Sequence, residues 1–166
     1  MKRLALAALV GAVVLQSVTG AAATEVRAFE RGSWQQIRTA HAGEPLVVHF
    51  WGVTCGPCRA ELPQWGQLAN ERADLRLVTI DADLVPNAPK AVRAMLEQSG
   101  LSSHAENWMF SDDFVERLRY EVDPQWSGDI PRTLLIAADG TTTLLEGVAD
   151  FSRIRAWLDT QPAARQ

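Results

Sequence analysis

The sequence predicts an α/β domain in which parallel strands come first and a β-hairpin comes last. Residues 46–51 form a compact apolar run of strand length, which is typical of a buried central strand. Residues 56–73 then keep apolar side chains on one helical face, and residues 75–80 return to strand character. This strand–helix–strand order indicates a parallel pair. Residues 138–140, Ala-Asp-Gly, lie between two apolar runs and predict the hairpin.

The remaining elements follow from local periodicity and from capping signals. They are a short helix with Ser33 as N-cap that ends before Gly43, a helix over residues 88–99, a short strand over residues 108–110, a helix over residues 112–120 opened by Ser111, hairpin strands over residues 133–137 and 141–145, and a final helix with Phe151 and Ile154 on its apolar side.

The first 23 residues have the three parts of a secretory signal peptide. Two basic residues precede an apolar run over residues 4–15, and three alanines at residues 21–23 form a small-residue cleavage pattern. We therefore predict a signal peptide over residues 1–23 and a mature domain over residues 24–166. The alternative is an N-terminal anchor, because the apolar stretch has about the length of a membrane span, roughly 20 residues. In both cases the domain faces outward, which for this leader indicates a bacterial periplasm.

Composition and charge restrict the function classes. The chain has 166 residues, of which 47% are hydrophobic and 22% charged, as expected for one soluble globular domain. Loss of the leader removes two basic residues and no acid, so the net charge changes from −4 to −6. Nucleic acid is not an expected partner of such an acidic surface.

The chain's two cysteines form the segment Cys55-Gly56-Pro57-Cys58, where the central strand gives way to a helix. Backbone N–H groups and the positive end of the helix dipole stabilise a thiolate at the first cysteine. We predict that Cys55 attacks a substrate disulfide and that Cys58, one helical turn away, resolves the mixed disulfide. Pro57 is tolerated because its missing N–H has no partner in the first helical turn.

A structural disulfide and half of a zinc site are the alternatives for this cysteine pair. Zinc requires about four ligands. Beyond the cysteines the chain offers only His41, His49 and His104, with no second CxxC motif. A redox site without a metal or other cofactor is therefore the preferred interpretation, with the Cys55–Cys58 disulfide itself as the redox group.

Residues 48–63, Val-His-Phe-Trp-Gly-Val-Thr-Cys-Gly-Pro-Cys-Arg-Ala-Glu-Leu-Pro, resemble the strand, tryptophan, CxxC and helix-kinking proline of the thioredoxin superfamily, in its exported TlpA/ResA-like branch. A second match is residues 130–133, Ile-Pro-Arg-Thr, ahead of an apolar run. The resemblance covers nearly all of residues 44–160. It implies a thioredoxin fold, with a central mixed sheet flanked by helices and an inserted βα segment within residues 81–128.

The resemblance also assigns site residues. Trp51, Gly56 and Pro57 belong to the family's first motif, and Pro131 is implied to be cis and to lie against the CxxC. The backbone of Ile130 would then be free to pair with an extended substrate segment. The resemblance further implies that this proline keeps metal away from the dithiol.

Several residues depart from the family pattern or leave alternatives open. Thr54 replaces the usual tryptophan before the first cysteine. His49 stands where cytosolic thioredoxins carry a buried acid, and it is either a neutral core histidine or a proton shuttle to Cys58. Glu61 either serves the proton chemistry of Cys58 or is a solvated acid of the first helical turns. Trp126 either walls a substrate groove or is a core residue under a long loop.

Gly-Pro between the cysteines and isoleucine before the cis-proline are, by resemblance, the choices of a reducing site. We expect a thiol:disulfide oxidoreductase that reduces disulfides of exported proteins and is recharged by a membrane electron donor, because an oxidising compartment would otherwise drain the dithiol. Candidate substrates are the haem-binding cysteines of apocytochrome c, copper-site cysteines and mis-paired exported proteins. The alternatives are a net oxidase or isomerase and a thioredoxin-fold copper chaperone, for which the chain offers no methionine-rich or histidine-rich loop.

Overall fold

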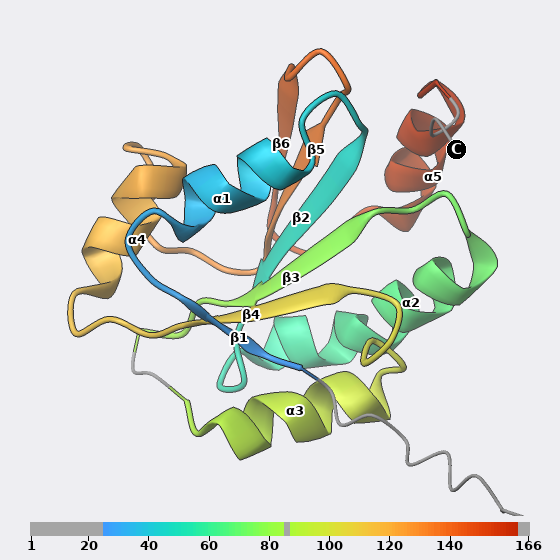
Figure 1. Ribbon diagram of the computed structural model, residues 1–166. Helices are drawn as coiled ribbons and strands as arrows, with labels where there is room; N and C mark the ends of the chain where they lie inside the picture. Colours follow the sequence, from blue (N-terminus) through green and yellow to red (C-terminus); the bar gives the residue numbers. More distant parts are fainter. Residues whose placement is uncertain (1–24, 85–86, 163–166) are drawn as a thin grey trace, which may run out of the picture.

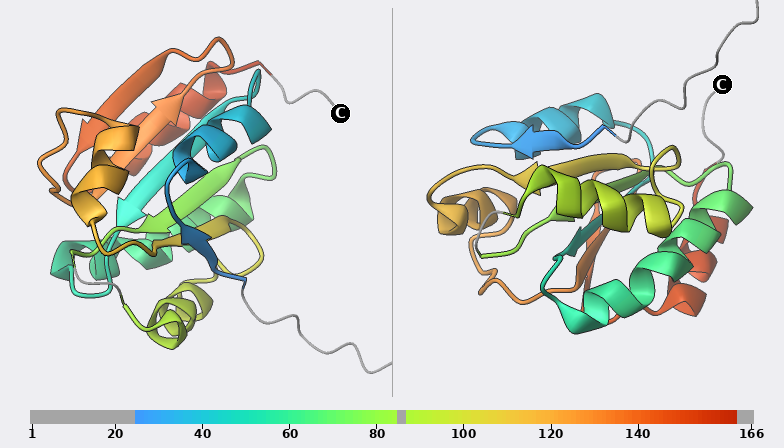
Figure 2. Two further views of the ribbon diagram at one scale, coloured as in Figure 1. Left: turned by 60° about the vertical axis from the view of Figure 1, so that its left-hand side comes forward. Right: turned by 90° about the horizontal axis from the view of Figure 1, so that it is seen from below.

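A six-stranded mixed sheet with helices on both faces forms the framework of the protein (Figures 1 and 2). The computed structural model describes residues 25–84 and 87–162. The elements in chain order are β1 (Arg27–Phe29), α1 (Ser33–Ala40), β2 (Leu46–Trp51), α2 (Gly56–Glu71), β3 (Leu77–Asp81), α3 (Pro89–Gln98), β4 (Glu106–Phe110), α4 (Val115–Val122), β5 (Arg132–Ile136), β6 (Thr142–Glu146) and α5 (Phe151–Asp159).

The strands lie in the order β1-β4-β3-β2-β5-β6. Strand β2 is central: it pairs in parallel with β3 and antiparallel with β5. Strands β1, β4 and β3 continue the parallel half, and the hairpin of β5 and β6 forms the antiparallel edge. The predicted parallel pair, the hairpin and the mixed thioredoxin-type sheet are thus confirmed. The helices α3 and α4 and the strand β4 all fall between residues 81 and 128, where the inserted segment was expected.

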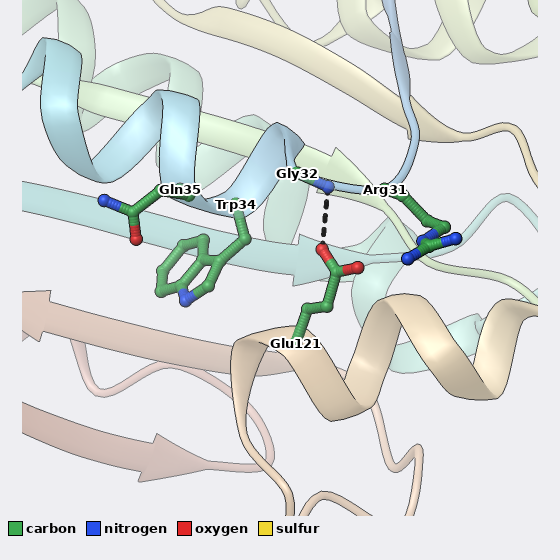
Figure 3. Close-up of a pocket in the computed structure, with 5 residues that line it drawn as sticks. All are labelled: Arg31, Gly32, Trp34, Gln35 and Glu121. Atoms are coloured by element: carbon green, nitrogen blue, oxygen red, sulfur yellow. Dashed lines mark hydrogen bonds between the residues drawn. The ribbon is translucent and has the colours of Figure 1, made fainter.

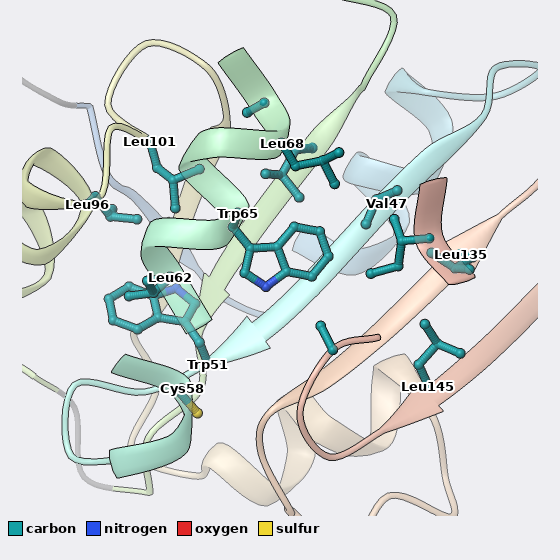
Figure 4. Packing of buried hydrophobic residues seen from close by; sticks show 14 of the residues in the cluster. Val47, Trp51, Cys58, Leu62, Trp65, Leu68, Leu96, Leu101, Leu135 and Leu145 are labelled. Carbon is teal, nitrogen blue, oxygen red and sulfur yellow. The ribbon is translucent and has the colours of Figure 1, made fainter. Parts of the chain in front are cut away.

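Strand β2 separates two apolar clusters, because its side chains alternate between the faces of the sheet. Val47 and Trp51 point to the face covered by α2, α3 and α5, where they join the cluster shown in Figure 4. Val48 and Phe50 point to the opposite face, which α1 and α4 cover. His49 lies between Val47 and Trp51 at an alternate position of the strand, so its side chain points to the same face as theirs, under α2.

A glycine allows α2 to approach the end of α3. A Cβ atom on Gly66 would lie 1.7 Å from the backbone oxygen of Ser99, a distance that no real contact permits. The helix therefore needs glycine at this position, although glycine lowers helix propensity. This approach places the carboxyl-terminal half of α2 against α3 and leaves its amino-terminal half over the end of β2 (Figure 1).

Two predicted helix starts are wrong. The N-cap of α1 is Gly32, with φ of 83°, and the Oγ atom of Ser33 instead accepts the N–H of Glu30. Helix α4 begins at Val115 rather than after Ser111. The reason is a local turn, since the carboxylate of Asp112 accepts the N–H of Phe114 and holds that N–H outside the helix.

Strand β1 was not predicted from the sequence. It has three residues, and it pairs in parallel with β4 at the edge of the sheet. So short a strand shows no periodicity of its own.

The predicted leader, residues 1–23, lies outside the described residues. Within residues 25–84 and 87–162, no helix has the length and apolar character that crossing a bilayer requires.

Candidate active site

Cys55 and Cys58 are joined by a disulfide at the amino-terminal end of α2. Cys55 is the N-cap residue, and its Sγ atom accepts the N–H of Cys58 at 3.2 Å. Cys55 is half-buried, whereas Cys58 is fully buried and lies in the cluster with Trp51 and Leu62 (Figure 4). The two sulfurs therefore differ in the way that the predicted roles require: the accessible sulfur faces the helix N–H groups, and the other lies behind it.

The turn before Cys55 depends on a glycine. A Cβ atom on Gly52 would lie 2.2 Å from Oδ1 of Asp83 and 2.8 Å from Cδ1 of Ile130. Because glycine has no Cβ atom, three segments can meet next to the disulfide: the end of β2, the loop after β3 and the loop before β5.

The second predicted motif lies directly against the disulfide. The Ile130–Pro131 peptide bond is cis, as the resemblance implied. The carbonyl oxygen of Ile130 lies 3.8 Å from the Sγ atom of Cys55. On the other side, the oxygen of Pro131 accepts the N–H of Gly147 at 3.0 Å, which holds this loop to the end of β6. The fold thus brings residues 75 positions apart to one site.

His49 and Glu61 meet in the interior between β2 and α2. Both side chains are almost fully buried, with exposed fractions of 0% and 1%. Nε2 of His49 lies 3.1 Å from Oε1 of Glu61, a close contact without the alignment of a hydrogen bond. The other oxygen, Oε2 of Glu61, accepts the N–H of Ala149 at 2.7 Å. Glu61 is therefore not the solvated acid that one interpretation of the sequence proposed; that interpretation is wrong.

The remaining contacts of His49 fix the orientation of its ring. Nδ1 is hydrogen-bonded to Oγ1 of Thr133 at 3.0 Å. The ring also stacks on Trp65, with centroids 4.7 Å apart. Cys58 and Glu61 are three residues apart on α2, so both face the same junction as His49. His49 and Glu61 thus form a buried polar pair beneath the amino-terminal half of α2.

Thr54, which replaces the family's tryptophan, holds the loop by two hydrogen bonds. Its N–H and its Oγ1 donate to the two carboxylate oxygens of Asp83, at 2.9 and 2.7 Å. Nδ2 of Asn87 donates to Oδ2 of Asp83 at 2.7 Å and to Oδ2 of Asp81 at 2.8 Å. Sequence analysis missed this cluster of Thr54, Asp81, Asp83 and Asn87. The available signal was two acids, at alternate positions, directly after a buried strand.

Comparison with known proteins shows what the chain is similar to. Residues 25–95 match the family model described as Thioredoxin, a span that runs from β1 into α3 and includes both cysteines. This match covers somewhat less than half of the chain. Curated relatives include Thioredoxin Asp f 28 of Aspergillus fumigatus, 42% identical over 41 residues, which are 25% of this chain and 38% of that protein. The thioredoxin-like protein YneN of Bacillus subtilis is 33% identical over 61 residues, 36% of each chain. The chain spans about two fifths of the length of these curated relatives.

Solved structures share the fold over a longer stretch. A secreted Mycobacterium tuberculosis disulfide oxidoreductase, described as homologous to E. coli DsbE, superposes with a TM-score of 0.57 at 21% identity, covering 73% of this chain and 84% of that one. StoA from Bacillus subtilis superposes with a TM-score of 0.51 at 19% identity, covering 70% and 83%. A likeness at these identities establishes the thioredoxin fold.

Trp51 and Trp126 are both buried in the domain. Trp51 is fully buried beside Cys58. Trp126 is 6% exposed, packs edge-on against Phe50 and donates its Nε1–H to the oxygen of Asp129. These contacts fit the core alternative for Trp126, and a role in substrate binding stays a prediction.

A cavity of about 290 Å³ opens beside Cys55. Thr54, Asp83, Ile130 and Arg119 contribute to its walls. A wider hollow of about 620 Å³ lies between α1 and α4, where Trp34 and Glu121 face it (Figure 3). That hollow contains neither cysteine nor any of the predicted site residues, so the smaller cavity is the one that bears on the chemistry.

Asp81 lies at the end of β3 and is 2% exposed. Burial raises the pKa of Asp81 to about 6, and the negative charge of Asp83 adds to the effect. The hydrogen bond from Asn87 opposes this shift without cancelling it. Asp81 is thus a carboxyl group that the folded domain holds near the point of protonation, one strand away from the cysteines.

We predict that Asp81→Asn changes the pH dependence of stability. The pKa of Asp81 is higher in the folded chain than its ordinary value of 3.8, so its protonation favours folding below pH 3.8, and this contribution is lost as the pH rises through about 6. Between those limits the free energy of unfolding of the wild type, relative to the variant, should fall by up to about 3 kcal/mol. Urea unfolding of both oxidised proteins at a series of pH values measures the difference.

Asp113→Asn is the matched control, since it makes the same charge change at an exposed position. Parallel profiles for the wild type and Asp81→Asn would show that Asp81 does not take up a proton on folding.

Proposed function

We propose that this protein is a thiol:disulfide oxidoreductase that reduces disulfides of exported proteins through Cys55 and Cys58. The observation that carries the proposal is the pairing of an accessible sulfur at a helix N-cap with a buried sulfur directly behind it. An inert structural disulfide needs neither this asymmetry nor the open cavity beside Cys55. The family match and the fold of the solved neighbours support the same chemistry.

In the proposed reaction, the Cys55 thiolate of the reduced protein attacks one sulfur of a substrate disulfide. The substrate S–S bond breaks, one substrate thiolate leaves, and a mixed disulfide links Cys55 to the substrate. The Cys58 thiolate then attacks Sγ of Cys55 and releases the second substrate thiolate. Two electrons have passed to the substrate, and the protein is left as the Cys55–Cys58 disulfide, the form described above.

Substrate docking is proposed to use the backbone of Ile130. Its carbonyl oxygen lies 3.8 Å from Sγ of Cys55, so a polypeptide strand that pairs with this segment brings its own sulfur to Cys55. Main-chain pairing of this kind gives affinity with little sequence readout, which suits a reductase of several proteins.

The proposed direction of electron flow is reduction. Gly56, Pro57 and Ile130 are the residue choices of a thioredoxin-type site, by resemblance. In an oxidising periplasm the dithiol then depends on a membrane electron donor. Haem-binding cysteines of apocytochrome c, copper-site cysteines and mis-paired exported proteins are the proposed substrate classes. A net oxidase or isomerase remains the alternative function of the same residues.

Replacement of each cysteine by serine should separate the two roles. Cys55→Ser is expected to abolish insulin disulfide reduction, because no attacking thiolate remains. Cys58→Ser should still attack, and it should accumulate mixed disulfides that non-reducing electrophoresis detects. Turnover of Cys58→Ser at the wild-type rate would contradict the assigned roles.

The reduction potential of the wild-type Cys55–Cys58 couple tests the direction of electron flow. A value of about −270 mV indicates a reductase, and a value of about −120 mV indicates an oxidant.

Glu61 and His49 are proposed to take the proton of Cys58 during resolution. Burial disfavours the Cys58 thiolate, and the Glu61 carboxylate is the buried acceptor on the same face of α2. Glu61→Gln should slow resolution roughly tenfold or more near neutral pH while leaving the first attack by Cys55 nearly unchanged. His49→Gln should act in the same direction. Stopped-flow measurement of both steps from about pH 6 to about pH 9 separates them.

Glu71→Gln provides the control for this experiment, because Glu71 is an exposed acid of the same helix. Equal and pH-independent resolution rates in the wild type, Glu61→Gln and His49→Gln would leave both buried residues with a structural role only.

Export is proposed from the leader over residues 1–23. The mature protein should begin near Thr24, since signal peptidase cleaves after small residues. Intact-mass analysis and fractionation of the native protein test this, with Ala23→Arg as a variant that should keep its leader. A wild-type protein that retains residues 1–23 in the membrane fraction would instead be an anchored one.

A further inference from the structure

Arg119 is a buried cation in the wall of the cavity beside Cys55. It lies on α4, its exposed fraction is 5%, and it shares the cavity wall with Cys55 and Ile130. No local pattern singles it out, because an arginine on a short helix is ordinarily exposed. Its burial beside the reactive sulfur therefore requires an explanation.

The hydrogen-bonding capacity of Arg119 is largely unused. A guanidinium has five N–H donors. One of them, on Nη2, donates to the oxygen of Ala82 at 3.4 Å, and Nε has no partner. Within the described residues, no carboxylate lies at ion-pair distance from Arg119; Glu116 and Asp129 act on it only from farther away. Burial of a cation without a paired anion costs free energy.

A second buried arginine shows that this arrangement is particular to the cavity. Arg132 is 3% exposed, and it forms an ion pair with Asp123. The guanidinium groups of Arg132 and Arg119 both lie over the ring of Trp126, at 5.3 and 5.8 Å from its centroid. The same aromatic side chain thus supports two cations, and the one without a carboxylate is the one that faces the cavity.

The segment above Arg119 is built to admit the guanidinium. A Cβ atom on Gly128 would lie 2.4 Å from Nη1 of Arg119, so the backbone of Gly128 passes close to the end of this side chain. Gly128 also has φ of 103°, a conformation that favours glycine. The guanidinium is therefore enclosed between the backbone of Gly128 and the ring of Trp126.

The other groups of the cavity indicate the charge of its ligand. Both oxygens of Asp83 already accept hydrogen bonds from Thr54 and Asn87, so Asp83 has little capacity left for a basic ligand. Leu84, which is 63% exposed, and Ile130 give the cavity apolar surface. An apolar chain that bears a carboxylate complements this set, because a guanidinium binds a carboxylate through two parallel hydrogen bonds.

We propose that the cavity beside Cys55 is a carboxylate-binding subsite, in which Arg119 selects substrate polypeptides that carry an acidic side chain or a free carboxyl terminus next to the reactive cysteine. The inference rests on the proposed oxidoreductase function, and it adds a charge preference to the main-chain pairing at Ile130. It also explains how a chain with a net charge of −4 accepts an acidic segment at this one place.

The test uses short cysteine peptides joined by a disulfide to 2-thiopyridine, an uncharged reporter whose release as pyridine-2-thione is followed by its absorbance. Four peptides of equal length carry either glutamate or glutamine beside the cysteine, and either a free or an amidated carboxyl terminus. For the reduced wild type, kcat/KM should be about tenfold higher with a singly acidic peptide than with the neutral one. This difference should come from a lower KM. Comparison of the peptide with the glutamate side chain and the peptide with the free carboxyl terminus shows which carboxylate is preferred.

Arg119→Gln should bring the acidic-to-neutral ratio close to one. Arg119→Lys should keep part of it, since an ammonium supplies the charge without the two-pronged geometry. Arg117→Gln is the matched control, because Arg117 is an exposed arginine of the same helix that lies over Phe114. This control should retain the wild-type ratio.

Three results would overturn the subsite. They are equal use of acidic and neutral peptides by the wild type, a preference that survives in Arg119→Gln, and a preference that Arg117→Gln loses equally. The first needs no variant, so it holds even if Arg119→Gln does not fold. Reduction of the neutral 2-hydroxyethyl disulfide by the wild type is measured in parallel: its absence would contradict the oxidoreductase proposal itself, independently of the subsite.

Discussion

Strand β2 has no side that faces solvent, and the site depends on this constraint. All its residues are buried, because β3 and β5 occupy its edges and helices cover both faces of the sheet. A polar side chain in such a strand must find its partners inside the protein. His49 finds them in Glu61 and Thr133, which come from α2 and β5. The strand therefore ties together the elements that surround Cys58.

The loop that carries Cys55 is held in place by a buried acid, Asp83, and burial of acids lowers stability. Thr54 gives up the apolar surface of the family's tryptophan and gains two hydrogen bonds to Asp83. Asp83 in turn lies beside Asp81, and a single amide, that of Asn87, bridges the two carboxylates. Two acids in a desolvated place oppose folding, so the arrangement exchanges stability for a fixed position of the loop.

Local patterns predicted the elements that carry the site. The central strand was expected over residues 46–51 and is found there, and the Ala-Asp-Gly turn correctly predicted the hairpin of β5 and β6. These succeed because their signals lie within a few consecutive residues. The cis bond before Pro131 came from the family resemblance and from no local signal. The same holds for its place against Cys55.

What the sequence did not predict depends on contacts between distant segments. Thr54 and Asp83 are 29 residues apart, and Glu61 and Ala149 are 88 apart, so neither hydrogen bond leaves a local trace. Strand β1 exists only because β4 offers it an edge. The burial of Arg119 depends on a close pass of Gly128, which the periodicity of α4 does not reveal.

The hydrogen bond between Ala149 and Glu61 also has a consequence for the order in which the molecule is made. A ribosome delivers both cysteines long before it delivers Ile130 or Ala149, so a growing chain carries two ordinary thiols. The environment that distinguishes Cys55 from Cys58 is complete only when the start of α5 has been synthesised. A chain that ends before Ala149 lacks the N–H group that binds Glu61, so an unfinished molecule does not yet possess the complete reactive centre.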